Sequence, residues 1–263
     1  MGIDNLPEIK DYFYGLFARK FIKDSFKYNR FSQLLASFCV TNPDNENTFK
    51  DPAAHCAELI EVLNTKFQSH YNLTQHLSLD DAMAAFNGYS SIRQFIPTKP
   101  HRFGYKIWCL CCQGYLYKFE LYQGSDDEKS EDTSVTVATA LRLTNGLENQ
   151  NYIIYTDSYF TSPNLLRALA DRGISSCGAV RSNRSGMPRI DGWDGDKWDR
   201  GMFRILYQND MALTIWKDRK LLRVLYNHLP TPNETTTVER TGHGNQTIQL
   251  ECPNAVNDYF HNS

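Results

Sequence analysis

The sequence has no long apolar segment. Nowhere does a run of about eighteen apolar residues occur, so no segment is predicted to span a membrane. The first residues, MGIDNLPEIKDYF, have no apolar signal core, and secretion is not expected. An excess of charge of one sign is also missing, because 28 Lys and Arg face 30 Asp and Glu for a net charge of −2. A nucleic-acid partner would therefore have to be bound by local basic patches.

Cys-x-x-Cys pairs are absent as well, although the chain has seven cysteines. This absence removes the commonest arrangement of structural zinc ligands. Cys109, Cys111 and Cys112 lie within one apolar run, and we interpret them as core thiols rather than metal ligands. The odd number of cysteines, without a secretory signal, fits a reducing compartment. A hydrophobic content of 41% predicts a folded protein with a sizeable core.

Helical periodicity dominates the first part of the chain. Three segments have apolar residues at helical spacing, namely Asp11 to Phe26, Arg30 to Cys39 and Ala53 to His70. From His76 the pattern changes to the alternation of strands. We therefore predict that residues 1–75 form a helical region.

The remainder divides into three predicted regions. Residues 76–190 combine strands and helices in a mixed α/β core. Residues 191–230 are predicted to form a small β insertion, a meander with strands at Met202 to Gln208, Met211 to Trp216 and Leu221 to Tyr226. Residues 231–263 begin with a polar, threonine-rich stretch and are predicted to form a flexible C-terminal segment.

The clearest local pattern lies in NYIIYTDSYFTSPNLLRALADRG, from Asn151 to Gly173. A short apolar run predicts a buried strand, and Asp157 follows where that strand ends. Ser162 and Pro163 are an N-cap residue and a first-turn proline, and the closing glycine ends the helix. A carboxylate at the C-terminal end of a buried strand lies where open α/β sheets bind their ligands. By itself, Asp157 could equally cap a turn.

A second carboxylate follows another predicted strand. In LSLD, from Leu77 to Asp80, alternation places both leucines on one face and Asp80 on the other. Asp81 would point with the leucines into the core, which is unfavourable for a charge. We therefore expect the strand to end near Asp81 and take Asp80 as the candidate site residue.

The predicted order is a strand, two further strands joined by a hairpin at Gln113-Gly114, then helix, strand, helix and strand. This is the order of a ribonuclease H-like mixed sheet, in which carboxylates lie on the first and fourth strands. Asp80 and Asp157 would then lie on neighbouring strands and could bind one Mg²⁺ through carboxylate oxygens.

Basic residues gather near both predicted acids. The segment from Ala82 to Phe119 contains cations but no acid. A second basic segment, RSNRSGMP, follows the last core strand. An ordinary solvated surface and a phosphate-facing surface both fit this pattern. The candidate DNA-binding residues are Arg93, Lys99, Arg102, Lys106, Arg181 and Arg184.

Several longer motifs together resemble PiggyBac-family transposases. They are LSLDDAMAAFNGYSSIRQFIPTKPHRFGYK, YTDSYFTSPNLLRALADRGISSCGAVRSNRSGMP and IWKDRK, in that order. The N-terminal NLPEIKDYF and YNRFSQLLASF resemble the helical region that precedes the catalytic core of the family. The resemblance covers most of the chain.

This resemblance implies a ribonuclease H-like domain of the DDE type that cleaves DNA phosphodiesters and transfers strands. Asp80 matches the first catalytic and metal-binding acid, and Asp157 matches the second. The implied cofactor is Mg²⁺ or Mn²⁺, and the implied partner is double-stranded DNA at transposon ends with TTAA targets. The resemblance further implies that the helical region over residues 1–75 serves dimerisation or DNA binding. It also implies a nuclear location and allows a homodimer.

Two departures from the family pattern bear on activity. The third acid of the family follows a Cys-Pro-x-Ala-Val-x-Asp-Tyr stretch, which Cys252 to Tyr259 matches, and the sequence given stops at Ser263 before that acid would arrive. Asp258 matches a non-catalytic aspartate. In addition, Phe86-Asn87-Gly88-Tyr89 replaces a segment that usually carries two cations.

Two functions therefore remain open. The chain is either a transposase-type enzyme or a domesticated, non-enzymatic protein that binds DNA or chromatin. With two of three acids, a second metal position would be poorly held. We expect a C-terminally truncated fold that does not cut DNA.

Overall fold

The computed structural model describes residues 6–38, 40, 53–124, 134–188, 198–229, 233–242, 244 and 246–263. The chain forms two compact units, Met1–Leu59 and Ile60–Ser263, which are described separately. Its helices are η1 (Ile9–Tyr12), α1 (Lys20–Ser25), α2 (Tyr28–Ala36), α3 (Ala54–His70), α4 (Val135–Leu143), α5 (Pro163–Ala170) and α6 (Asn254–Asn262). None of the described helices has the length and apolar character needed to cross a membrane.

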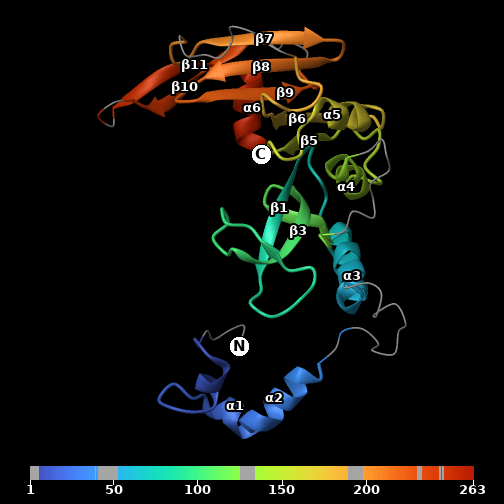
Figure 1. Ribbon diagram of the computed structural model, residues 1–263, viewed down its shortest axis with the longest axis vertical. Coiled ribbons are helices and arrows are strands. Elements are labelled where there is room, and N and C mark those ends of the chain that lie inside the picture. Colours follow the sequence, from blue (N-terminus) through green and yellow to red (C-terminus); the bar gives the residue numbers. More distant parts are fainter. Residues whose placement is uncertain are drawn as a thin grey trace. The chain divides into compact units, whose positions relative to one another are not determined.

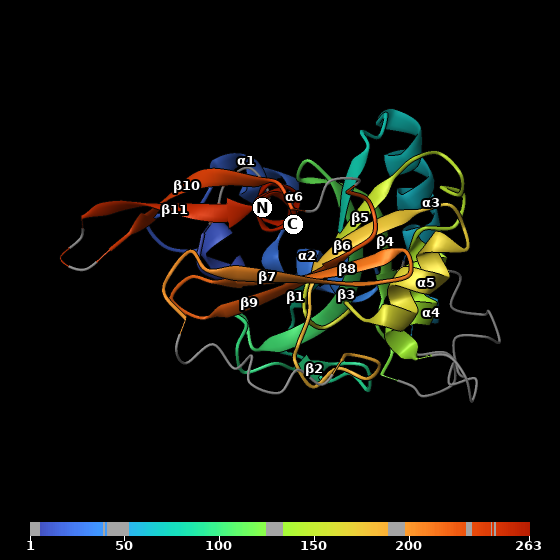
Figure 2. The same cartoon turned by 90° about the horizontal axis from the view of Figure 1, so that it is seen from above.

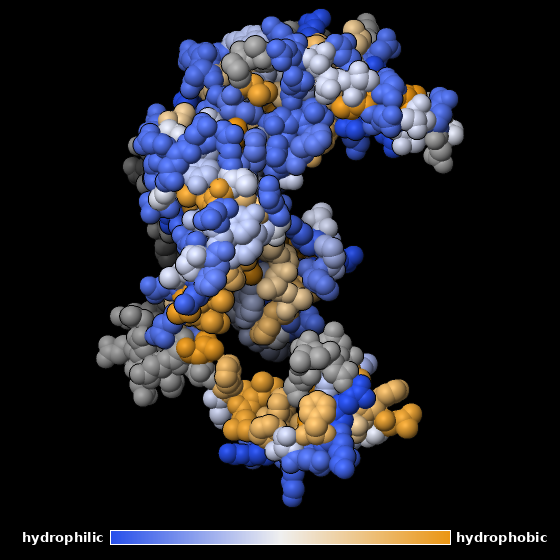
Figure 3. Space-filling model, turned by 180° about the vertical axis from the view of Figure 1, so that it is seen from behind, coloured by the Kyte–Doolittle hydropathy of each residue, from blue (hydrophilic) through white to orange (hydrophobic). Residues whose placement is uncertain are grey.

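The first unit consists of short helices packed around aromatic rings. Phe13 is buried, and its ring centroid lies 5.6 Å from that of Tyr28 and 5.5 Å from that of Phe31. The predicted helix from Asp11 to Phe26 is broken into η1 and α1, because Gly15 between them adopts a φ of +81°. Apolar side chains also gather on the outer surface of these helices, as the orange colour in Figure 3 shows.

The second unit begins within helix α3, between Leu59 and Ile60. The C-terminal part of α3 packs on strand β4 (Tyr115–Leu121), where the side-chain amide of Asn64 donates to the Phe119 carbonyl and its oxygen accepts from the Phe119 N–H, both at 2.9 Å. The Tyr71 ring stacks on that of Tyr115 at 4.3 Å. The boundary expected after residue 75 therefore lies at Leu59 and Ile60 instead.

A mixed sheet forms the centre of this unit (Figures 1 and 2). Its strands are β1 (His76–Ala85), β2 (Gln94–Phe95), β3 (Phe103–Cys112), β4, β5 (Ile153–Thr156), β6 (Ser175–Ala179), β7 (Phe203–Gln208), β8 (Met211–Lys217) and β9 (Leu221–Tyr226). The spatial order β4-β3-β1-β5-β6 has β1, β3 and β4 antiparallel and β1, β5 and β6 parallel. This is the ribonuclease H-like order that the sequence predicts.

Each face of the sheet has its own apolar core. On one face, α4 and α5 cover Leu77, Leu79 and Ile154. On the other face, α6 covers Tyr155 and Cys177 with the help of its own buried residues. Alternation along each strand explains this division, since neighbouring residues point to opposite faces. Asp80 and Asp157 have the parity of Tyr155 and therefore lie on the α6 face.

The predicted meander forms strands β7, β8 and β9. It is not a separate β unit, however. Strand β9 pairs antiparallel with β6 through Cys177–Tyr226, Gly178–Leu225 and Ala179–Val224, which extends the central sheet by three strands. The expected insertion over residues 191–230 is thus part of the main sheet where it is described; residues 189–197 and 230–232 lie outside the described residues.

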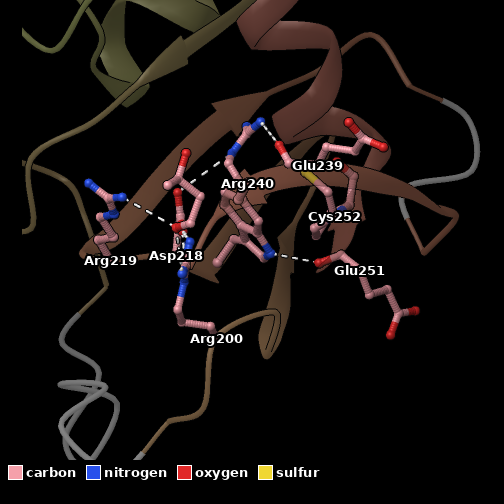
Figure 4. Close-up of polar contacts among 10 residues, drawn as sticks. Arg200, Asp218, Arg219, Glu239, Arg240, Glu251 and Cys252 are labelled. Carbon is pink, nitrogen blue, oxygen red and sulfur yellow. Dashed lines mark hydrogen bonds and ion pairs between the residues drawn. The ribbon is translucent and has the colours of Figure 1, made fainter. Parts of the chain in front are cut away.

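The C-terminal segment differs most from expectation. Instead of a flexible tail, the described residues after 232 form a hairpin of β10 (Thr235–Thr241) and β11 (Thr247–Pro253), followed by α6. β-Branched threonines suit a strand, and Val238, Ile248 and Leu250 pack on the α6-face core. Figure 4 shows ionic contacts that attach the hairpin to the meander, including Arg240 Nε at 3.6 Å from Asp218 Oδ2.

Trp216 is the main anchor between the meander and the C-terminal segment. Its side chain is fully buried, its Nε1 donates to the Glu251 carbonyl at 2.8 Å, and Phe260 of α6 lies edge-on to its ring. We expect Trp216→Ala to lower the free energy of unfolding by about 3–5 kcal/mol. Urea denaturation measures this loss. Phe260→Ala truncates a partly exposed ring that contacts Trp216, so it should lower the free energy of unfolding clearly less. Equal losses in the two variants would contradict the anchor role of Trp216.

Candidate active site

Asp157 lies directly after β5, in a turn that several backbone contacts fix. Its Oδ1 accepts hydrogen bonds from the N–H groups of Tyr159 and Phe160 at 2.9 and 3.3 Å. The Thr161 hydroxyl donates to the Asp157 carbonyl at 2.7 Å. Helix α5 then begins as predicted, with the Ser162 Oγ accepting from the Leu165 N–H at 3.1 Å. The turn therefore holds the Asp157 carboxylate in a defined position.

Asp80 lies within β1 rather than at its end. The strand continues to Ala85 because β3 pairs with it from Ser78 to Ala85. Strands β1 and β5 run parallel, with Leu79 beside Thr156. Asp80 and Asp157 follow these two residues by one position each, so the two carboxylates lie side by side on one sheet face. The two acids are thus neighbours in the structure, and their role as site residues stays a prediction.

The expectation that the first strand ends near Asp81 is wrong. Asp81 lies inside β1 on the leucine face, and its carboxylate forms an ion pair with Lys99 Nζ at 3.1 Å. The same Nζ donates to the Asp81 carbonyl at 3.0 Å. The charge of Asp81 can occupy this face because Lys99 neutralises it. The Asp81 carboxylate is therefore already paired with a cation of the chain.

The electrostatics of Asp80 fit a cation site. Partial burial raises the pKa of the Asp80 carboxyl above its usual range, the Asp81 N–H opposes this by donating to Oδ1 at 2.7 Å, and the charge of Asp157 raises the pKa further. Within the described residues, Oδ2 of Asp80 and Oδ2 of Asp157 accept no hydrogen bond. Two repelling carboxylates with open oxygens are the donor set that a divalent cation prefers.

The pKa of Asp80 should respond to its neighbour. We expect Asp157→Asn to lower the pKa of Asp80, because the repulsive charge is removed. Asp81→Asn should lower it less, because Asp157 is the larger of the two repulsive causes. Carbon-detected NMR of the side-chain carboxyl, recorded against pH, measures both shifts. A larger shift in Asp81→Asn would contradict the side-by-side placement of the two candidate acids.

The candidate DNA-binding cations occupy different environments. Arg93 donates to the Gly88 carbonyl at 2.8 Å, and Arg184 Nη2 donates to the carbonyls of Ser158 and Tyr159 at 2.5 and 2.6 Å. With Lys99, these residues already contact groups of the chain. Arg102 and Arg181 are exposed. Arg181 also lies beside the Asp157 turn, with its Nε 3.4 Å from the Ser158 Oγ.

Lys106 was predicted to lie on a phosphate-facing surface, and the structure shows that this prediction is wrong. It is only 9% exposed, and its Nζ lies 3.9 Å from the Trp108 ring centroid and 4.5 Å from that of Tyr159. Burial lowers the pKa of its ammonium group, while the Asp81 charge acts in the opposite direction. Lys106 shares the buried face of β3 with Trp108, so it packs inside the unit rather than facing a DNA backbone.

Two of the three cysteines near Asp80 are core thiols as the sequence predicts, whereas Cys111 is only half-buried. Cys109 and Cys112 are buried, and Cys109 lies opposite Asp80 across β1 and β3. Burial raises the pKa of the Cys109 thiol to about 12, with smaller contributions from neighbouring groups, so this thiol stays protonated at neutral pH. The site therefore presents carboxylates rather than thiolates.

A second polar cluster on the α6 face has no counterpart among the sequence predictions. It brings together His76, Tyr155, Cys177, His228 and Asp258, which come from five separate segments. No local motif links these positions, and the sequence pattern indicates only a non-catalytic Asp258. These residues come together only because α6 packs on β5, β6 and β9.

Comparison with known proteins decides the family. A family model described as Transposase IS4 matches residues 1–262. Human PiggyBac transposable element-derived protein 2 is 27% identical over 247 residues, which cover 90% of this chain and 41% of that protein. The chain belongs to the PiggyBac-type transposase family. This PiggyBac-type chain is also 29% identical to human PiggyBac transposable element-derived protein 3 over 167 residues, 62% of this chain and 28% of that protein.

A solved structure supports the PiggyBac-type fold. It is the cryo-EM structure of a piggyBac transposase synaptic complex with hairpin DNA, which superposes with a TM-score of 0.73 at 19% sequence identity. The match covers 90% of this chain and 48% of that one. The PiggyBac-type chain thus spans less than half the length of these relatives.

Proposed function

We propose that this chain binds double-stranded DNA and holds a divalent cation between Asp80 and Asp157. The observation that carries the proposal is that Asp80 and Asp157 each follow, by one position, the paired residues Leu79 of β1 and Thr156 of β5, so that the charge of Asp157 acts on Asp80. Family membership supports it, because transposases of the DDE type use divalent metals. The similar solved structure is a synaptic complex with hairpin DNA, which supports DNA as the partner.

Each residue of the proposed site has a distinct role. Asp80 and Asp157 bind the cation, Mg²⁺ or Mn²⁺, through their oxygens. When bound, such a cation supplies Lewis acidity toward a phosphoryl oxygen. The turn that follows Asp157 keeps that carboxylate oriented, and the Arg184 contacts to Ser158 and Tyr159 brace the same turn. Exposed Arg181, beside this turn, contacts a DNA phosphate.

We infer that the 263 residues alone bind DNA without cleaving it. The described residues place two carboxylates at the site, and two-metal phosphodiester chemistry needs a further acid. This favours the non-enzymatic, DNA- or chromatin-binding alternative for a polypeptide of this length. The proposal includes TTAA-containing target DNA, a nuclear location and a homodimer, all supported by family membership alone.

A nicking assay tests the catalytic part of the proposal. DNA with terminal inverted repeats is incubated with the chain and Mg²⁺ or Mn²⁺, with Asp157→Asn as the matched variant. We expect no cleavage above background from either protein. Cleavage by the unmodified chain that disappears in Asp157→Asn would overturn the inactive assignment and establish an enzyme.

Salt dependence tests the DNA-binding part. We expect Arg181→Ala to weaken binding similarly for all sequences and to reduce the slope of log affinity against log salt by about 1. Arg172→Ala is the control, because Arg172 lies beyond the far end of α5 and pairs with Glu148 at 3.5 Å. Fluorescence anisotropy at several salt concentrations measures the slopes. Equal slopes for Arg181→Ala and the unmodified chain would contradict the phosphate contact.

A further inference from the structure

The polar cluster on the α6 face contains three side chains of the kinds that bind transition metals. Cys177 comes from β6, His228 follows β9, and Asp258 lies on α6. One ligand atom of each, a thiol sulfur, a ring nitrogen and a carboxylate oxygen, lies within 4.8 Å of the other two. Three segments far apart in the sequence thus bring sulfur, nitrogen and oxygen donors to one point.

Surrounding groups already orient the carboxylate. The Tyr155 hydroxyl donates to Asp258 Oδ2 at 2.7 Å, and Asn262 Nδ2 donates to Oδ1 at 3.1 Å. Because Tyr155 uses its only proton there, His76 Nδ1 must donate to the Tyr155 oxygen over their 2.9 Å contact. Such outer hydrogen bonds are what fixes ligand orientation in protein metal sites.

His228 has one ring nitrogen that the described part of the chain leaves unsatisfied. Its Nε2 lies 2.8 Å from Asp258 Oδ2, but its Nδ1 is buried and has no hydrogen-bond partner among the described residues. The side chain is only 5% exposed, so bulk water does not supply the missing partner. A buried nitrogen without a hydrogen-bond partner requires an explanation, and a bound ion is one of those that proteins use.

We propose that Cys177, a ring nitrogen of His228 and Asp258 bind one Zn²⁺ ion. Zinc accepts sulfur, nitrogen and oxygen donors at a tetrahedral centre, whereas Mg²⁺ prefers oxygen ligands alone. The three protein ligands leave one position for water. Because the ligands come from β6, the end of β9 and α6, the ion would fasten the C-terminal helix to the central sheet.

This zinc site shares no residue with the proposed cation site at Asp80 and Asp157. The two sites also differ in chemistry, since one contains a thiol and an imidazole and the other contains carboxylates. Failure of either proposal therefore leaves the other intact, and the Asp80→Asn/Asp157→Asn double variant should keep its zinc.

The test measures metal content and the identity of the ligands. The full chain is purified without chelator, dialysed against a trace of Zn²⁺ and assayed by mass spectrometry of the metal. We expect one zinc per chain, lost in Cys177→Ala. Replacement by Co²⁺ should give a sulfur-to-cobalt charge-transfer band, also absent from Cys177→Ala. Cys252→Ala is the matched control, because it removes an equally buried thiol from the same apolar core.

Tyr155→Phe provides the second arm. It keeps all three ligands and removes one orienting hydrogen bond, so zinc affinity should fall about 10- to 100-fold while the stoichiometry stays at one. A purely structural tyrosine would leave the affinity unchanged. If Cys177→Ala does not fold, the metal content and the cobalt band of the unmodified chain still test the zinc proposal. No bound zinc, no cobalt–sulfur band, or zinc retained by a folded Cys177→Ala would each overturn the proposal.

Discussion

Asp157→Asn is expected to weaken Mn²⁺ binding at the candidate active site by on the order of 100-fold or more, because changes outside the first ligand shell of metal sites already cost about 10- to 100-fold. The asparagine keeps the hydrogen bonds from Tyr159 and Phe160 but loses the negative charge. Asp80→Asn should have the same effect. Isothermal calorimetry or Mn²⁺ electron paramagnetic resonance measures the affinities. Asp81→Asn is the control, since Asp81 lies on the opposite face and pairs with Lys99.

Stability separates this loss of binding from unfolding. The pKa of Asp80 is raised in the folded state, so ionised Asp80 disfavours folding at neutral pH, and the fold gains stability as pH falls through that pKa. Asp80→Asn should therefore melt at the same or a higher temperature than the unmodified chain at pH 7. The gain stays below about 1 kcal/mol, because solvent screens a carboxylate that is only partly buried. A folded variant with unchanged Mn²⁺ affinity would rule out the Asp80–Asp157 cation site.

The same pKa gives a pH dependence. Cation binding requires ionised Asp80, and its raised pKa means that protons compete at a higher pH than for an ordinary aspartate. Mn²⁺ affinity should thus begin to fall earlier as pH is lowered. In Asp81→Asn this onset should move to lower pH, because one of the charges that raise the pKa is gone.

Local signals allowed the sequence to predict where Asp157 and its supporting helix lie. The run before Asp157, the Ser162 cap and the Gly173 stop each lie within a few residues of the feature they specify. The alternation in LSLD likewise placed Asp80 opposite the leucines. These patterns depend on strand periodicity and on local helix-capping residues, and tertiary packing did not override them.

Features that depend on distant pairing were not predicted. Strand β1 extends to Ala85 only because β3 lies beside it, and β9 joins the sheet only because β6 offers an edge. The threonine-rich C-terminal stretch is polar enough to suggest a flexible tail, but its few apolar residues meet a core formed elsewhere. Lys106 is the exception, since its spacing from Trp108 already puts both on one strand face.

Gly178→Ala is expected to damage both the fold and the candidate active site. A Cβ at Gly178 of β6 would lie 2.1 Å from the Thr161 Oγ1, 2.5 Å from the Thr156 Oγ1 and 2.6 Å from the Thr156 carbonyl oxygen. Both threonines are fully buried and hydrogen-bond to each other at 2.7 Å. Neither can move aside freely, so we expect a loss of about 1–3 kcal/mol in the free energy of unfolding. Ser175→Ala, in the same strand, is the control.

The contacts of Thr161 connect this overpacking to Asp157. The Thr161 hydroxyl that the new methyl group would strike also donates to the Asp157 carbonyl, so relief of the clash must shift the turn that carries the carboxylate. Mn²⁺ affinity should consequently fall in Gly178→Ala even at temperatures where the protein stays folded. A double-mutant cycle isolates the cause, since Thr161→Ala removes the nearest clashing atom. The destabilisation by Gly178→Ala should be smaller in the Thr161→Ala background. An equal destabilisation in both backgrounds would show that the close approach of β6 to the Asp157 turn is not what requires glycine.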